Sequence, residues 1–174
     1  MNKILRLGGA AILGIILSAC DNNKEPTPAD FTALLKDTTE QHCTDLTKLP
    51  MDLNTYYNNI PNDPNEPKYK MAMRGNLVGP GSGTILKPTA RYAEVKAKIK
   101  DGKLCDGNFN NYVVQTANKT EDGSYLARVT REFTPEPWAD QGIRDAFFLD
   151  KPVTELTYLF RKNGKDWQGT PQNE

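Results

Sequence analysis

The sequence predicts an α+β fold in which an N-terminal amphipathic helix packs on a curved antiparallel sheet of five to seven strands. Apolar residues recur at helical spacing after Thr27, whereas from Tyr69 onward they alternate with polar residues, as in strands with one buried face. Turns containing glycine or asparagine separate the alternating segments. A single helix has only a sheet to cover its apolar stripe, so the two must form layers.

The first nineteen residues have the composition of a secretory leader. Lys3 and Arg6 precede an apolar run, residues 7–17, which is too short to cross about 30 Å of hydrocarbon as a stable helix. The motif Leu17-Ser18-Ala19-Cys20 resembles the lipobox of bacterial lipoproteins. The resemblance implies that Cys20 carries a diacylglycerol, that residues 1–19 are cleaved off and that the new amine is acylated. The alternative is an ordinary secretory signal with a chance cysteine. In the precursor we expect residues 4–18 to be helical.

Length and charge define the mature body. Cleavage leaves 155 of the 174 residues, enough for one domain with a hydrophobic core. We expect a lipidated tether at 20–27, one globular domain at 28–169 and a polar tail at 170–174. The mature chain has 20 basic and 22 acidic residues, a formal net charge of −2, without a basic patch. Nucleic acid is therefore excluded as an expected partner.

Two cysteines remain for the body once Cys20 is lipidated. In an oxidising compartment we expect Cys43 and Cys105 to form a disulfide. The alternative is a reactive thiol assisted by His42. Adjacent residues on a helix point about 100° apart, so His42 and Cys43 would not face one another.

The predicted helix begins at Thr27-Pro28-Ala29-Asp30, which combines an N-cap threonine, proline at the first position and an acid three residues after the cap. It is expected to run for three to five turns and to end by Pro50. Its apolar face is formed by Phe31, Leu34, Leu35, Thr38, His42, Leu46 and Leu49. His42, the chain's one histidine, is interpreted as a packing residue of this face.

Residues 51–67 predict an ordered surface loop with one short helical turn around Tyr56, Tyr57 and Ile60. Residues 69–74 alternate as a strand. The glycine cluster at 79–83 predicts a turn, because no Gly-Lys-Ser/Thr motif follows that would make it a phosphate-binding loop.

Residues 93–100 also alternate and predict a strand that turns at Asp101-Gly102, although a helix capped by Thr89 is the alternative. Residues 112–117 and 125–133 predict a second hairpin, 135–150 a long connection, and 154–161 a strand that turns at Asn163-Gly164. This last hairpin, residues 156–167, resembles the closing hairpin of cystatin-like and NTF2-like domains, a likeness that brings no functional residues with it.

No pattern for catalysis or metal binding is present. The chain lacks a Gly-x-Ser-x-Gly elbow, and with one histidine and two paired cysteines it has too few ligands for zinc. Residues 62–66 lack the glycine and terminal glutamate of a calcium loop. We therefore expect no enzyme activity, no metal and no cofactor.

Contact residues are predicted at two loops. Trp138 follows two prolines and has Arg144 nearby, a composition typical of binding hot spots; Tyr56 and Tyr57 form a second candidate. Trp138 could instead fold back onto the sheet.

We therefore expect an envelope lipoprotein that binds a protein partner, as an accessory or assembly factor or as an inhibitor or immunity protein. The alternative is a small-ligand module with an apolar pocket between helix and sheet. We expect it to face the periplasm, on the outer rather than the inner membrane, although Asp21 resembles the inner-membrane signal of enteric lipoproteins.

Overall fold

The computed structural model describes residues 24–81 and 84–172. The leader, Cys20 and the expected helix at 4–18 lie outside these residues. Within the described part, no helix combines the length and apolar character needed to cross a bilayer. The described residues divide into two compact units: unit 1 is drawn from residues 24–38, 112–130 and 155–172, and unit 2 from residues 39–81, 84–111 and 131–154.

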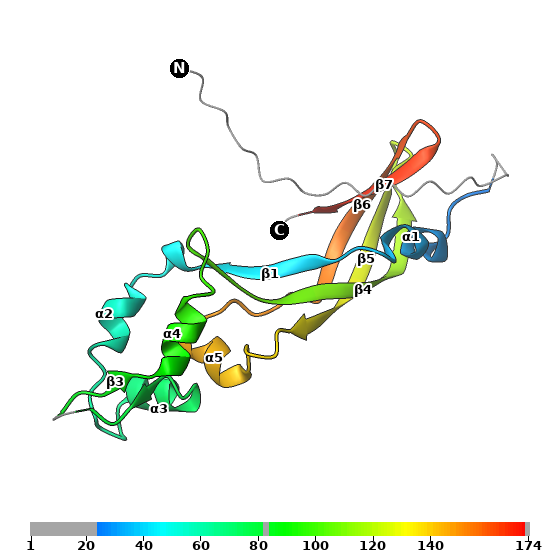
Figure 1. Ribbon diagram of the computed structural model, residues 1–174. Coiled ribbons are helices and arrows are strands. Elements are labelled where there is room, and N and C mark those ends of the chain that lie inside the picture. The colour runs from blue at the N-terminus through cyan, green and yellow to red at the C-terminus, as the bar shows by residue number, and fades with distance from the viewer. Residues whose placement is uncertain (1–23, 82–83, 173–174) are drawn as a thin grey trace, which may run out of the picture. The chain divides into compact units, whose positions relative to one another are not determined.

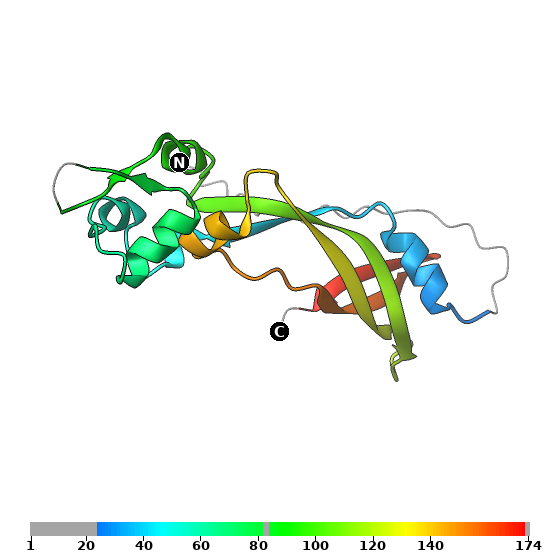
Figure 2. The same cartoon turned by 90° about the horizontal axis from the view of Figure 1, so that it is seen from below.

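The main sheet has five strands in the order β1-β4-β5-β6-β7, so the sequence prediction of an α+β fold with a curved antiparallel sheet and an N-terminal helix is confirmed (Figures 1 and 2). These strands are β1 (Glu40–Asp45), β4 (Lys103–Lys119), β5 (Tyr125–Pro135), β6 (Glu155–Asn163) and β7 (Asp166–Gln172). Strands β4 and β5 each contribute residues to both units. Whether residues 28–169 act as a single domain stays a prediction.

Unit 1 is built around α1 (Pro28–Leu35), which packs on the curved strands (Figure 2). The helix begins with a capping box, since the Thr27 hydroxyl accepts from the Asp30 amide and the Asp30 carboxylate accepts from the Thr27 amide at 2.7 Å. Phe31 is fully buried and lies 4.3 Å from the Phe160 ring, centroid to centroid. Tyr125 and Trp167 complete this aromatic cluster at 5.3 and 5.5 Å from Phe31.

Unit 2 contains the other helices, α2 (Leu53–Tyr57), α3 (Pro67–Arg74), α4 (Ala90–Lys96) and α5 (Gln141–Ala146), with the short helix η1 (Leu46–Lys48). Unit 2 also contains a two-stranded antiparallel ribbon formed by β2 (Val78–Gly79) and β3 (Lys87–Pro88). Figure 1 shows these helices gathered beside the end of β1 and the start of β4. Their core cluster includes Tyr57, Leu77, Leu104, Ile143 and Phe147, each completely buried.

The predicted extension of the N-terminal helix to Pro50 is wrong. The helix has only about two turns, and His42 and Cys43 lie on the edge strand β1. His42 and Leu46 are four residues apart, which fits both a period of two and helical spacing, so spacing could not separate the two structures. Pairing with β4 decides for the strand.

Two predicted strands are helices. Residues 69–74 belong to α3, where Pro67 takes the first helical position and lysine, methionine and arginine favour the helix. Residues 90–96 form α4, whose N-cap is Thr89, the alternative that the sequence left open. There the Tyr92 amide donates to the Thr89 hydroxyl at 3.3 Å. Ala93 and Ala97 gave the sequence its strand-like alternation with Val95 and Ile99, but both alanines are exposed on the helix side that faces away from the core.

The turns were predicted better than the segments between them. Lys100 and Lys103 exchange backbone hydrogen bonds of 2.9 and 2.8 Å across the Asp101-Gly102 turn. Both residues between them have positive φ, the type I′ pattern that Asp-Gly favours. The 112–133 hairpin and the 154–161 strand are also present, as β4, β5 and β6. Strand β7 continues to Gln172 by pairing with β6, so residues 170–172, which were expected in the polar tail, belong to the sheet.

Candidate functional site

A disulfide joins Cys43 on β1 to Cys105 on β4, as the sequence predicted. The two residues are cross-strand partners, and the register shifts between His42 and Cys43, so that His42 pairs with Gly107 and Asp106 is the extra residue of a bulge. The bulge turns Asp106 into the core of unit 2, where its side chain is completely buried. Gly107 is required there, since a Cβ would stand 2.5 Å from the Phe133 ring.

The buried Asp106 carboxylate organises a polar network. One oxygen lies 2.6 Å from His42 Nδ1, and the other pairs with the Arg144 guanidinium. Arg144 also donates to the Asp150 carbonyl oxygen at 2.9 Å. Strand β1, strand β4 and helix α5 are thereby tied together inside unit 2. No group of three His, Cys, Asp or Glu side chains suited to a metal occurs among the described residues.

Burial lowers the pKa of His42 below its usual value of 6.5, and the positive charge of Arg144 adds to this effect. The nearby carboxylate of Asp106 does not reverse the direction, because its charge is already balanced by Arg144. His42 is therefore neutral in the folded chain near pH 7, with Nδ1–H donating to Asp106. Its ring edges contact Phe109 and Phe133 at centroid distances of 5.5 and 5.4 Å, so it packs within the fold.

This lowered pKa predicts a loss of stability on mild acidification. Between the folded and unfolded pKa values the unfolded chain binds more protons, so the contribution of His42 is complete above about pH 6.5 and falls as pH drops, by at most about 1.4 kcal/mol per pH unit. Urea unfolding at pH 7.5 and 5.0 should show this slope in the native chain. The His42→Gln variant should lack it, since the chain has no second histidine. Equal slopes would contradict the direction of the shift.

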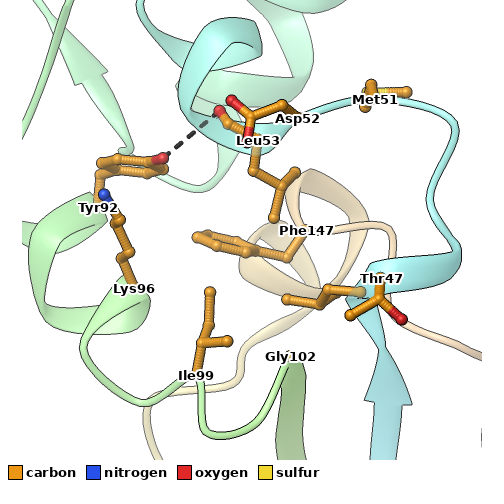
Figure 3. Close-up of a pocket in the computed structure, with 10 residues that line it drawn as sticks. Thr47, Met51, Asp52, Leu53, Tyr92, Lys96, Ile99, Gly102 and Phe147 are labelled. Atoms are coloured by element: carbon orange, nitrogen blue, oxygen red, sulfur yellow. Dashed lines mark hydrogen bonds between the residues drawn. The ribbon is translucent and has the colours of Figure 1, made fainter.

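A hollow of about 200 Å³ lies on unit 2 between η1, α2, α4 and the Asp101-Gly102 turn (Figure 3). We call it the η1–α4 hollow. Its walls are mainly apolar and consist of Leu46, Met51, Leu53, Tyr92, Ile99 and Phe147. In Figure 3, Leu53, Phe147 and Ile99 face the middle of the hollow, and the Tyr92 hydroxyl donates to the Leu53 carbonyl oxygen at 3.4 Å.

Polar residues, including one acidic and one basic side chain, border this apolar floor. Thr47, Asp52 and Lys96 line the hollow, and Lys96 is exposed on α4. The Asp52 carboxylate accepts from the Thr55 amide at 2.7 Å, which holds it in place at the start of α2. The hollow has the form to accept one apolar side chain of a bound molecule, and polar groups beside that side chain can pair with Thr47, Asp52 and Lys96 at the rim.

The predicted contact residues have different environments. Arg144 and Tyr57 are buried: Arg144 pairs with Asp106, and the Tyr57 hydroxyl donates to the Ala146 carbonyl oxygen. Burial raises the pKa of Tyr57, which stays a neutral donor. Tyr56 is half-buried, with the Lys68 ammonium 4.9 Å from its ring centre. Trp138 is half-buried against the core cluster, with the Lys98 ammonium 5.3 Å from its ring.

The residues that line the η1–α4 hollow could not be predicted from the sequence. They come from four separated segments, and the assignment of residues 93–100 to a strand placed Lys96 and Ile99 on opposite faces. On the helix and the turn that follows it, both border one hollow. The only available signal was the Thr89 cap of the alternative helix. Asp106 was missed because a bulge, which the sequence does not announce, directs it inward.

The hollow, the buried network and the disulfide are thus placed by geometry within unit 2 alone. Comparison with known proteins adds no relative to this description: no family model, no curated protein and no solved structure matches the chain.

Proposed function

We propose that this chain is a lipid-anchored, non-enzymatic protein of the bacterial envelope, and that unit 2 binds a protein partner through the η1–α4 hollow. The anchor rests on Leu17-Ser18-Ala19-Cys20 and its charged and apolar context. The Cys43–Cys105 disulfide supports an oxidising compartment, where such bonds persist.

The size and lining of the η1–α4 hollow carry the partner proposal. Small-ligand pockets enclose roughly 300–1,000 Å³, whereas this hollow has about 200 Å³. Protein interfaces use a few large side chains that enter such apolar depressions, surrounded by a polar rim. Six apolar side chains with Asp52 and Lys96 at the border suit one aromatic or branched aliphatic anchor of a partner.

The small-ligand alternative needed an apolar pocket between the N-terminal helix and the sheet. In unit 1 that space holds the rings of Phe31, Tyr125, Phe160 and Trp167, which pack within 4.3 to 5.5 Å of Phe31. No observation favours this alternative, and we do not propose it.

Filling the hollow tests the proposal. We expect Lys96→Trp to abolish crosslinking of the partner to this chain, because an indole at this exposed position of α4 can cover the apolar floor of the hollow. Cells producing the native chain or the variant, each with a photo-crosslinking residue at position 100 beside the hollow, are irradiated, and the adduct is identified by mass spectrometry. The native chain should give a discrete adduct in the membrane fraction.

Lys36→Trp is the matched control, since it makes the same change at an exposed lysine of unit 1. It should leave the adduct intact. Persistence of the adduct in Lys96→Trp would remove the hollow from the proposal. A Cys20→Ser chain should leave the membrane fraction; retention there would remove the lipid anchor.

A further inference from the structure

A second hollow of unit 2 has a different character. It has a volume of about 520 Å³ and lies between α3 on one side and the end of α5 with the segment that follows it on the other; we call it the α3–α5 groove. Its apolar lining is Pro67, Met71, Phe148 and Leu149. Lys70, Arg74, Arg144 and Asp145 are its charged residues. It shares no lining residue with the η1–α4 hollow.

Phe148 has an unusual backbone conformation for an aromatic residue. Its φ is +56°, in the left-handed region that bulky side chains avoid at a cost. The Phe148 amide donates to the Asp145 carbonyl and the Leu149 amide to the Arg144 carbonyl, at 3.2 and 2.9 Å. These bonds form a Schellman motif that ends α5, in which Phe148 holds the position usually taken by glycine. The helix end therefore does not need this ring.

The ring of Phe148 contributes to the groove instead. It is half-buried, lines the groove and meets the Tyr56 ring edge-on at a centroid distance of 5.7 Å. Met71 and Leu149 beside it are also only half-buried. Methionine adapts its shape to different partners, so this floor can accept apolar side chains of several forms.

Positive charge dominates the groove. Helix α3 carries Lys68, Lys70 and Arg74 and no acidic residue. Neither Lys70 nor Arg74 forms a salt bridge with another described residue. Asp145 is the one acidic lining residue, and its carboxylate accepts from the Gln141 amide nitrogen at 2.6 Å. The charge of Arg144 is balanced by Asp106, so Lys70 and Arg74 are left to meet an anion.

We propose that the α3–α5 groove binds an acidic amphipathic segment of the partner protein. Carboxylates of the segment pair with Lys70 and Arg74, and an apolar side chain between them packs on Met71, Phe148 and Leu149. This inference rests on the proposed function for the identity of the partner as a protein. A polypeptide suits the site better than a membrane surface, because lipid recognition uses clusters of about four to eight cations. This concave groove has three cationic lining residues, and one of them, Arg144, is already paired with Asp106.

Labelled peptides test the groove directly on the full-length protein in detergent. The probe is a short fluorescein-labelled peptide in which glutamates alternate with leucines, followed by fluorescence anisotropy. Two further probes replace the glutamates by lysines or the leucines by serines. We expect binding of the first probe alone, weakening as salt is raised toward about 1 M, where the screening length is about 3 Å. Equal binding of all three probes, or preference for anionic phosphatidylglycerol vesicles over the peptide, would overturn the proposal.

Two variants separate recognition from folding. Phe148→Gly should bind the first probe at least tenfold more weakly while its Tm stays unchanged or rises, since glycine relieves the left-handed conformation. A lower Tm would show that the ring serves the fold, and would overturn the proposal. Lys70→Glu with Arg74→Glu should also reduce affinity at least tenfold. The matched control is Lys162→Glu with Lys165→Glu, exposed lysines of unit 1, which should bind normally.

These outcomes are distinct from those of the crosslinking experiment. If the probe binds but no cellular adduct forms at the η1–α4 hollow, the groove stands as an anion-recognising surface and the proposed partner site fails. If the adduct forms and no probe binds, only the groove fails.

Discussion

Asp106→Asn is expected to lower the free energy of unfolding by about 3–5 kcal/mol at pH 7, the usual cost of removing one partner from a buried ion pair. The substitution preserves shape but leaves Arg144 without a counter-charge in the core of unit 2, where Asp106 is completely buried and Arg144 nearly so. Urea unfolding measured by tryptophan fluorescence reports this loss. In a Trp167→Phe background the emission comes from Trp138 alone, which belongs to unit 2.

The double variant Asp106→Leu with Arg144→Met is the control for this prediction. Because both charges are removed together, it should cost less than Asp106→Asn alone. A single-variant loss below about 1 kcal/mol would show that the network is hydrated and contributes little.

Arg144→Met gives a further signature of the same network. Arg144 contributes to the lowered pKa of His42, so its removal leaves Asp106 to pair with the imidazole and to raise that pKa instead. The stability contributed by His42 would then be complete below about pH 6.5 and lost as pH rises through the folded value, the reverse of the native chain. An unchanged pH slope in Arg144→Met would show that burial alone sets the pKa.

Loss of the Cys43–Cys105 disulfide is expected to cost roughly 4 kcal/mol. The bond joins residues 62 apart in the sequence, and the chain-entropy model assigns that much to a loop of this length. Both cysteines lie in unit 2, and the loop that they close includes α2, α3 and α4. Cys43→Ser with Cys105→Ser should therefore shift the urea midpoint reported by Trp138.

Reduction of the native chain by a phosphine should produce the same shift, and it should leave the double variant unaffected. Amide hydrogen exchange provides a second readout, because β1 is an edge strand that, among the described strands, pairs only with β4. Its amides should exchange faster once the crosslink is gone. A midpoint that does not respond to reduction would contradict the prediction.

Local patterns account for the parts of the fold that the sequence predicted well. The Thr27 capping box, the Asp101-Gly102 turn and the disulfide depend on residues whose local chemistry permits few alternatives. Apolar spacing was less informative. The segments at 36–49, 69–74 and 90–96 satisfied strand and helix periods about equally over their short lengths, and pairing with β4 or packing against the unit 2 core chose between them.

The amino-acid sequence by itself determined the leader motif, the cysteine pair and the α+β class, because each depends on residue identity or on long alternating runs. Tertiary structure alone decided that Asp106 enters the core, that Arg144 meets it, and that Lys96 and Ile99 border one hollow. For Asp106 the physical reason is that a one-residue bulge in β4 changes which side chains face inward. Both hollows likewise join segments far apart in the chain, so no local pattern could indicate them.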